Sequence, residues 1–402
     1  MTALMVVGIG ADGLAGIGAA ARHAIETADV LFGSERQLAL VGAASDARRV
    51  SWPSPLLPAL PTLLEAHPGQ VRCVLASGDP MFFGIGATLV RLLGADQVRV
   101  LPHPSSMSLA CARLGWPIET VETVSVVGRP IASVRRVLRS GQRVLVLGLD
   151  AATPAAVATL LVGSGYGAST LSVLSQLGGA DESRVDGTAA EWSPAAIADL
   201  NVIAIECRLD FGARALPEVP GLPDDAYRSD GQLTKREVRA VTMSSLAPLP
   251  GELLWDVGAG SGSIGIEWLR SHRTCRAIAI ESDAERAERI RENADALGVP
   301  SLDVVHGSAP AALAYLPTPD AVFIGGGLTA SGQLEACWQA LRSGGRLVVN
   351  AVTVESEAAV AAGYARLGGE LTRIEISRSS PVGAFTGWRP AMPVTQWLVG
   401  KP

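Results

Sequence analysis

Short apolar runs that stop at clusters of glycine recur along this chain. The run from Leu253 to Trp255 predicts a buried strand, and Asp256 ends it just before a turn that holds Gly258, Gly260 and Gly262. Beyond the turn, apolar residues between Ile264 and Leu269 predict a helix that packs on the sheet. A strand, a glycine turn and a helix in this order are typical of a nucleotide-binding crossover, whose ligand lies at the carboxyl end of the strand.

A second apolar run narrows the choice of ligand. It spans 276–280 and ends at Glu281, about twenty residues past the turn, where a carboxylate at the mouth of a cleft can accept both hydroxyls of a ribose. We expect this carboxylate to pack against little. NAD, FAD and S-adenosylmethionine all fit the arrangement at this point.

Further runs predict the remaining strands of this sheet, at 302–305, 320–324, 346–350 and 394–399. The first of them is followed by Gly307, Ser308 and Ala309. With Ala259 and Ser261 inside a G-x-G-x-G turn, the succession resembles the class I methyltransferases. That resemblance implies a Rossmann-like fold, S-adenosylmethionine as the cofactor, and contacts from Ser308 and Ala309 to its adenine.

The beginning of the chain repeats the pattern of strand and glycine. An apolar strand from Leu4 runs into Gly8 and Gly10, and a second strand at 29–33 follows an alanine-rich helix, so a parallel β-α-β start is predicted. Taken alone, this glycine turn is equally consistent with a plain strand-to-helix connection.

The stretch VRCVLASGDPMFFGIG, residues 71–86, contains another strand and turn. Pro80 stops the strand after Gly78 and Asp79, and the small residues leave room for a ligand near the backbone. Asp79 is equally well explained as a turn residue that bonds its own backbone. A strand at 98–101 follows, and Ser105 with Ser106 predicts the start of a helix with free amides.

Four motifs in this half occur in the order of the tetrapyrrole methylases: VGIGADGL, SGDPMFFGIG, PSSMSLACARLGWP and SVVGRP. The resemblance implies two α/β subdomains with S-adenosylmethionine in the cleft between them, and contacts from Gly8, Gly10, Gly78, Asp79, Phe82 and Ser106. Three positions depart from the family pattern, namely Ala11, His103-Pro104 and Val127. Val127 replaces a histidine, which removes an ionisable group from the site.

The segment 216–231 is rich in Pro, Gly and Asp and predicts a linker. We therefore predict a first domain at 1–213, a linker at 214–232 and a second domain at 233–402. Thr234 and Glu237 have the spacing of a capping box at a helix start. The stretches DAYRSDGQLTKREVRA and DVGAGSGSIGIEW resemble the decarboxylating methyltransferase of cobalamin synthesis, in which the threonine that matches Thr234 lies over the cofactor.

Together the two halves resemble a fused family of cobalamin-synthesis enzymes from Met5 to about Trp397. The resemblance implies one S-adenosylmethionine site per domain. It also implies methylation of a precorrin at C5 by the first domain, and methylation at C15 with decarboxylation of the ring C acetate by the second, giving precorrin-8X.

Methyl transfer from a sulfonium to carbon needs alignment more than a protein nucleophile. No catalytic residue is assigned, because the five histidines form no spaced motif. A substrate with several carboxylates calls for cations, and the candidates near the cofactor edge are Arg228, Lys235, Arg236 and Arg378. Each of them is also consistent with an ordinary exposed charge.

Composition excludes several other functions. The net charge of −6 without a basic run disfavours a nucleic-acid partner. The five cysteines are scattered without a C-x-x-C pair, which favours a reducing cytoplasm and argues against a metal site. The most apolar window, 144–165, is interrupted by Asp150 and Pro154, and the start of the chain lacks a basic leader. We expect a cytoplasmic homo-oligomer with no membrane segment.

Two functions from other classes stay open at this level. An NAD-dependent oxidoreductase would explain two glycine turns, but the chain lacks a convincing catalytic His or Tyr constellation. A non-catalytic tetrapyrrole carrier would show decayed cofactor sites, whereas Gly258, Gly260, Gly262 and Glu281 are intact.

Overall fold

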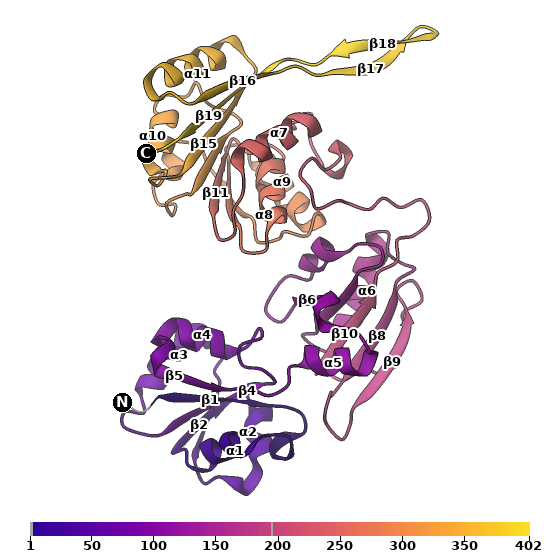
Figure 1. Ribbon diagram of the computed structural model, residues 1–402, viewed down its shortest axis with the longest axis vertical. Helices are drawn as coiled ribbons and strands as arrows, with labels where there is room; N and C mark the ends of the chain where they lie inside the picture. The colour runs from indigo at the N-terminus through magenta and orange to yellow at the C-terminus, as the bar shows by residue number, and fades with distance from the viewer. Residues whose placement is uncertain (1–2, 194–195) are drawn as a thin grey trace. The chain divides into compact units, whose positions relative to one another are not determined.

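The computed structural model describes residues 3–193 and 196–402. The chain divides into two compact units (Figure 1). The first unit comprises the chain up to Ile131 together with Val137–Arg214, and the second comprises Ala132–Arg136 together with Ala215–Pro402.

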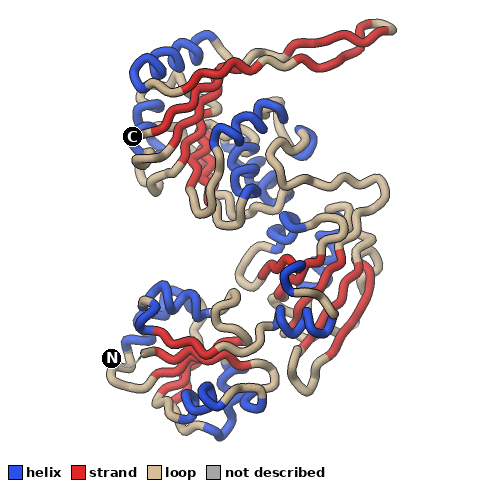
Figure 2. Tube along the Cα trace, in the orientation of Figure 1, coloured by secondary structure: helices blue, strands red, loops and turns tan. Residues whose placement is uncertain are grey.

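The first unit begins with a parallel sheet in the order β3-β2-β4-β1-β5. Its strands are β1 (Leu4–Ile9), β2 (Val30–Gly33), β3 (Arg48–Ser51), β4 (Arg72–Ser77) and β5 (Val98–Leu101). Helices cover both faces (Figure 2): α1 (Ala19–Glu26) and α2 (Glu35–Val41) on one, α3 (Leu56–Glu65) and α4 (Ile85–Leu93) on the other. Alternate residues of β1 explain this, because Val7 and Ile9 face α1 while Leu4 and Val6 face α3.

A second sheet completes the first unit, in the order β6-β7-β10-β8-β9. Its strands are β6 (Val121–Ser125), β7 (Arg143–Leu147), β8 (Thr170–Ser175), β9 (Ser183–Thr188) and β10 (Asn201–Glu206). β6 and β7 are parallel, and the other pairs are antiparallel. Helix α5 (Ser106–Leu114) packs Ala110 and Cys111 against this sheet, and α6 (Thr153–Gly163) follows β7. The predicted pair of α/β subdomains is confirmed.

The second unit contains a seven-stranded sheet in the order β13-β12-β11-β14-β15-β19-β16. Its strands are β11 (Leu253–Val257), β12 (Arg276–Glu281), β13 (Asp303–His306), β14 (Ala321–Ile324), β15 (Arg346–Ala351), β16 (Glu370–Ile374) and β19 (Val394–Gly400). The pairs from β13 to β15 are parallel, whereas β19 is antiparallel to both of its neighbours. The Rossmann-like sheet predicted from the apolar runs is confirmed.

Five α-helices accompany this sheet: α7 (Arg236–Leu246), α8 (Ser263–Ser271), α9 (Ala284–Ala296), α10 (Gln333–Ala340) and α11 (Val354–Leu367). Two hydrophobic clusters lie on its two faces. One includes Trp268 of α8 and Ile290 of α9, and the other includes Cys337 of α10 and Val360 of α11. The strand ends that carry the glycine turn are therefore held by packing on both sides.

A two-stranded hairpin extends away from the second unit's sheet (Figure 1). It consists of β17 (Ser377–Val382) and β18 (Phe385–Pro390). The sequence did not predict it, because the residues from Ser377 to Pro381 show no apolar alternation. Its strands form by pairing with each other rather than by burial of one face.

The predicted linker is only partly a connection. Leu222 and Tyr227 are buried in the core of the second unit, and the N–H groups of Gly221 and Leu222 donate to the Glu267 carboxylate at 2.7 and 2.9 Å. From Gly221 onward the segment is therefore part of the second unit.

The predicted capping box is wrong. Helix α7 begins at Arg236 with Lys235 as its N-cap residue, and no side chain caps it. The Thr234 carbonyl instead accepts a hydrogen bond from the Arg239 guanidinium, so Thr234 lies outside the helix.

None of the helices in the described parts of the chain has the length and apolar character that crossing a bilayer requires. All five cysteines are buried and free. Burial raises the pKa of the Cys73 and Cys337 thiols to about 12, which keeps both in the unreactive thiol form.

Candidate functional site

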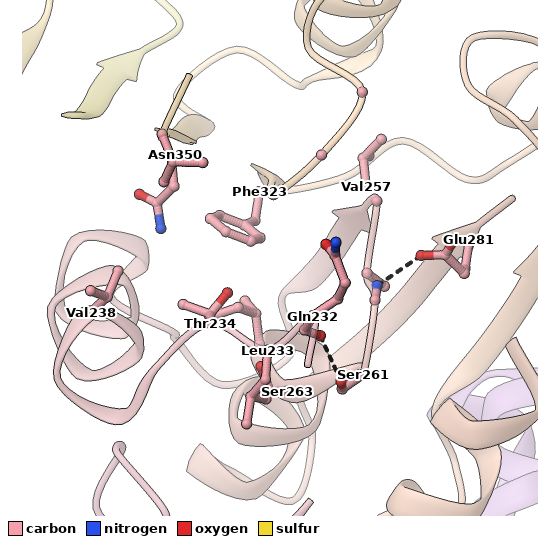
Figure 3. Close-up of a pocket in the computed structure, with 18 of the residues that line it drawn as sticks. Gln232, Leu233, Thr234, Val238, Val257, Ser261, Ser263, Glu281, Phe323 and Asn350 are labelled. Atoms are coloured by element: carbon pink, nitrogen blue, oxygen red, sulfur yellow. Dashed lines mark hydrogen bonds between the residues drawn. The ribbon is translucent and has the colours of Figure 1, made fainter. Parts of the chain in front are cut away.

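A cavity of about 750 Å³ opens at the carboxyl ends of the parallel strands in the second unit (Figure 3). Its walls come from the segment before α7, from the glycine turn after β11, and from the loops after β12, β13, β14 and β15. Carboxyl ends of parallel strands meet at one edge of a sheet, so residues distant in sequence gather there.

The glycine turn lies directly against a neighbouring loop. Gly258 has a φ of 71°, and a Cβ at this position would lie 2.8 Å from the backbone of Gly326. The Gly258 N–H also donates to the Ile280 carbonyl at 2.9 Å. Only glycine fits here, and the turn brings its backbone to the floor of the cavity.

Glu281 is more enclosed than the sequence suggested. Its side chain is 5% exposed, and its Oε2 accepts the N–H of Gly260 at 2.8 Å (Figure 3). Its Oε1 accepts the N–H of Asp283 at 3.0 Å. The expectation that this carboxylate packs against little is wrong, because Glu281 also holds the glycine turn in place.

The wall next to the glycine turn is a strap, defined here as residues 228–235. Ser261 Oγ donates to the Gln232 carbonyl at 2.8 Å (Figure 3). Asn293 joins the two sides, because its Nδ2 donates to the Ser261 carbonyl at 2.9 Å and to the Arg228 carbonyl at 3.0 Å. The Arg286 guanidinium at 2.8 Å and the Gln232 N–H hold the pKa of Asp230 down, to about 2, so the strap keeps a charged anchor.

A buried ion pair holds Thr234 of the strap and the residues just before the strap. Arg239 is fully buried and Glu267 is 2% exposed, and Nε of the arginine lies 2.6 Å from Oε1 of the glutamate. The remaining guanidinium nitrogens donate to the carbonyls of Thr234 and Leu222, and Tyr227 donates to Glu267 at 3.0 Å. A buried charge needs this complete set of partners, so the network specifies one position for Thr234.

Asp256 lies behind the cavity wall, within β11, and the sequence analysis did not select it. It is 1% exposed, and its Oδ2 accepts the N–H of Gly265 at 2.9 Å. Burial, with a smaller contribution from the charge of Glu281, raises the pKa of Asp256 to about 7. A carboxylate two residues before the first glycine of the turn, at the end of an apolar run, was a usable signal.

Two amide side chains form the far end of the cavity and were also missed. Asn350 Nδ2 donates to Thr242 Oγ1 at 2.9 Å, and its Oδ1 accepts from Gln396 Nε2 at 2.9 Å. Gln333 Nε2 donates to the Gly326 carbonyl at 2.9 Å. A polar residue at the end of a predicted buried strand was the available signal for Asn350.

The structure brings most of the predicted residues of this unit to the cavity. Those that line it are Thr234, Lys235, Gly258, Ala259, Gly260, Ser261, Glu281, Ser308, Ala309 and Arg378. Gly262 does not line it and instead precedes α8 with a φ of 75°.

Two of the predicted cations lie elsewhere. Arg228 is directed to Glu292 of α9 at 2.7 Å, and Arg236 is an exposed residue of the first turn of α7. Neither lines the cavity, and their contact with a substrate stays a prediction. Arg378 does line the cavity, where it pairs with Glu237.

The turns predicted in the first unit also converge at one sheet edge. A Cβ on Gly8 would lie 2.1 Å from the Gly78 carbonyl oxygen and 2.7 Å from the His103 nitrogen. Gly8, Gly78 and His103 are therefore in backbone contact at the ends of β1, β4 and β5. Ser106 begins α5 behind them, and Ser105, rather than Ser106, is its capping residue.

Asp79 makes the local turn bond that was one of its two interpretations, because its Oδ1 accepts the Met81 N–H at 2.8 Å. Next to Gly10, the His103 ring lies 3.3 Å from Asp12 Oδ1. The Phe82 ring contacts the Phe83 ring edge to face, with centroids 4.9 Å apart.

Within residues 3–193 and 196–402, no group of three His, Cys, Asp or Glu side chains is arranged to hold a metal ion.

Two family models match the chain. The family described as tetrapyrrole (corrin/porphyrin) methylases matches residues 3–192, and the family described as precorrin methyltransferase domain matches residues 225–401.

Curated relatives extend over the whole chain. A Sinorhizobium sp. protein named precorrin-6Y C(5,15)-methyltransferase (decarboxylating) is 52% identical over 98% of this chain and 95% of its own. A Mycobacterium tuberculosis protein of the same name is 49% identical over 99% of this chain and 100% of its own. A shorter Pyrobaculum calidifontis protein, named probable cobalt-precorrin-6B C(15)-methyltransferase (decarboxylating), is 38% identical over 42% of this chain and 89% of its own.

Proposed function

The chain belongs to the precorrin-6Y C(5,15)-methyltransferase (decarboxylating) family, and we propose on this basis that it methylates a precorrin at C5 and C15 and decarboxylates the ring C acetate, yielding precorrin-8X in cobalamin synthesis. The observation that carries this function is identity of about one half over nearly the full chain. The methyl donor is S-adenosylmethionine, with one site in each unit.

We assign a different methylation to each unit. The archaeal relative that covers 42% of this chain is named as a C15 decarboxylating methyltransferase. The precorrin methyltransferase domain matched at 225–401 falls in the second unit. We therefore assign C15 methylation and decarboxylation to residues 233–402, and C5 methylation to residues 1–213. The predicted linker, 214–232, lies between these two ranges, and its part from Gly221 onward packs in the second unit.

In the second unit the cofactor lies over the glycine turn. Gly258, Ala259, Gly260 and Ser261 supply its backbone contacts, and Gly262 lets the turn pass into α8. Glu281 keeps free lone pairs on both oxygens, which accept the ribose hydroxyls while Oε2 still holds Gly260. Thr234 covers the cofactor from the strap, and Ser308 with Ala309 contacts the adenine.

The same cavity extends past the cofactor toward the base of the hairpin. Ile376 and Met392 line this part, with Lys235 and Arg378 at its rim. The apolar walls receive the macrocycle and the two cations bind its carboxylates. When S-adenosylmethionine is bound, it supplies a methyl group on a positive sulfur.

The protein's role in this step is to align the substrate carbon with the methyl group and to exclude water. Asn350 and Gln333 add polar side chains to the lining of the cavity. As the C–C bond of the acetate breaks, the electron pair passes into the conjugated ring and carbon dioxide leaves. A site that removes water from that carboxylate favours the step.

In the first unit we assign cofactor contacts to Gly8, Gly10, Gly78, Asp79, Phe82 and Ser106. The support is that β1, β4 and β5 bring these residues to one edge of the sheet, with Gly8 and Gly78 in backbone contact. We expect no Ser-His or Cys-His pair to act as a nucleophile in either reaction.

We also place the protein in the cytoplasm as a homo-oligomer. Five buried, unpaired cysteines support a reducing compartment. Light scattering of the purified protein tests the oligomer, and a monomer at micromolar concentration contradicts it.

The function is tested by incubating the protein with its precorrin and carbon-13 methyl-labelled S-adenosylmethionine. NMR then locates the labelled carbons, and mass spectrometry measures the loss of carbon dioxide. Label at C5 and C15 with loss of one carboxyl group is expected. A tetrapyrrole that binds but is returned unchanged supports the carrier function instead.

A further inference from the structure

Phe83 in the first unit has an unusual backbone conformation. Its φ is 54°, in a region that bulky side chains rarely occupy. The loop around it is tightly packed, because a Cβ on Gly84 or Gly86 would lie 2.5 or 2.7 Å from the Pro80 carbonyl oxygen. Strain of this kind persists where the structure over-determines it and concentrates at functional sites.

The strained backbone presents an aromatic ring to solvent. Phe83 is 47% exposed, and the edge-to-face contact with Phe82 fixes its ring. Beside it, Met81 is also 47% exposed. The loop follows directly from the Gly78-Asp79 turn, to which the N–H of Met81 is bonded. An exposed apolar face therefore lies next to the turn assigned to the cofactor.

Arg129 covers part of this ring. Its guanidinium carbon lies 5.1 Å from the centroid of Phe83. Arg129 is exposed, and among the described residues no carboxylate forms an ion pair with it. A guanidinium stacked on a ring keeps its N–H edge free to bind a carboxylate bidentately.

We propose that Phe83 and Arg129 form part of the binding site for the tetrapyrrole substrate of the C5 reaction. The Phe83 ring contacts the flat face of the conjugated macrocycle, and Arg129 binds one of its peripheral carboxylates. This inference rests on the proposed function, because it names how the first unit holds its substrate. A flat, conjugated polyanion combines both properties that this pair offers.

The test uses the full chain, so that C15 methylation serves as an internal control. The variants are Arg129→Gln and Phe83→Gly, and the measured quantity is KM for the precorrin in C5 methylation at saturating S-adenosylmethionine. Loss of a charged hydrogen-bonding partner predicts a rise of about 10- to 100-fold for Arg129→Gln. Arg129→Lys recovers only part of this, because an ammonium binds a carboxylate as a point charge.

Phe83→Gly separates binding from folding. Glycine adopts a φ of 54° without strain, so the variant is expected to unfold at the same temperature as the parent or higher. Its KM for the precorrin in C5 methylation nevertheless rises several-fold, because the stacking surface is lost. The KM for S-adenosylmethionine in this reaction is unchanged.

Arg91→Gln is the matched control, since Arg91 is an exposed arginine near the end of α4 in the same unit. If Arg129→Gln and Phe83→Gly both leave the KM for the precorrin in C5 methylation unchanged, the proposed substrate-binding role of Phe83 and Arg129 is wrong. The exposed pair would then serve another purpose, such as a protein contact. If the parent itself shows no C5 methylation, the proposed function fails instead.

Discussion

The two units build a glycine turn at the same place, after the first strand of a parallel sheet, but complete it differently. In the second unit Glu281 ends the next strand and accepts the Gly260 N–H. In the first unit β2 ends at Gly33, and Ser34 caps the next helix instead of supplying a carboxylate. Its turn is held by the contact of Gly8 with Gly78 and His103. Similar glycine turns thus indicate that two backbone segments approach closely. They do not define the orientation of the ligand.

The walls of the two sites differ as well. In the second unit the strap precedes the sheet in sequence and is fixed by Asn293 and by the Arg239–Glu267 pair. In the first unit, loops after β4 and β5 and the Arg129 loop after β6 supply the surroundings. The C-terminal site therefore depends on buried polar contacts, and the N-terminal site depends mainly on backbone packing.

The largest expected effect comes from moving the boundary between the units. A fragment that begins at Leu216 lacks Ala132–Arg136 but keeps Leu222, Tyr227 and both N–H donors to Glu267. It is expected to be soluble, to bind S-adenosylmethionine and to release carbon dioxide from the substrate. A fragment that begins at Arg228 leaves Glu267 short of three donors in the core, at about 1–3 kcal/mol each, and is expected not to fold.

Circular dichroism and calorimetric titration compare the two fragments. Equal folding of both would show that residues 216–227 are an ordinary linker. Carbon dioxide release by the first unit alone would reverse the division of labour.

Glu281→Ala tests the carboxylate that only the second unit has. It removes the ribose contacts and the bond to Gly260 together, so cofactor affinity at the C15 site should fall on the order of a hundredfold or more. C5 methylation should continue. Glu281→Gln, which keeps an acceptor for Gly260, should lose less. Carbon-13 NMR measures methylation at each carbon. An equal loss of methylation at C5 and at C15 would show that the two sites are coupled.

Asn293→Asp tests the strap. The substitution keeps the shape but points a carboxylate oxygen at the carbonyls of Ser261 and Arg228, where an N–H group donated. The KM for S-adenosylmethionine in the C15 reaction should rise about tenfold, while kcat changes less. The C5 reaction of the same molecule is the control. A fall in kcat alone would contradict a role in positioning the cofactor wall.

Asp256 affects stability rather than cofactor binding, and its effect is measured as a dependence of the free energy of unfolding on pH. Because its pKa rises to about 7 on folding, the folded protein binds one more proton than the unfolded chain between pH 4 and 7. The contribution of Asp256 to the free energy of unfolding is complete below pH 4 and is lost as the pH rises through 7, by about 1 kcal/mol per unit.

Asp256→Asn should remove the contribution of Asp256 to the pH dependence of the free energy of unfolding. The stability of the variant relative to the parent should therefore increase as the pH rises. Hydrogen exchange of the backbone amides in β11 and α8 measures this free energy at each pH. Asp303→Asn, at an exposed position of β13, is the control. Parallel pH profiles for the parent and Asp256→Asn would contradict the assignment.

Much of the fold was predictable because buried strands of a parallel sheet are apolar on both faces. The runs at 253–257 and 276–281 therefore stand out from their surroundings. The hairpin β17–β18 was not predictable, since its strands are exposed and lack an apolar pattern. The directions of the Arg228 and Arg236 side chains were not predictable for a related reason, because an exposed charge carries no signal of the direction its side chain takes.

What the sequence by itself determined is the set of backbone requirements: apolar strands, the glycines that must approach a ligand, and a carboxylate one strand later. These are local properties, and each is encoded by residues that are close together in the chain. Only the tertiary structure decided that Glu281 also bonds Gly260, that Asn293 ties the strap to the glycine turn, and that Arg129 covers Phe83. Those contacts join residues separated by 21 to 65 positions in the chain. Their geometry exists only once the core has packed.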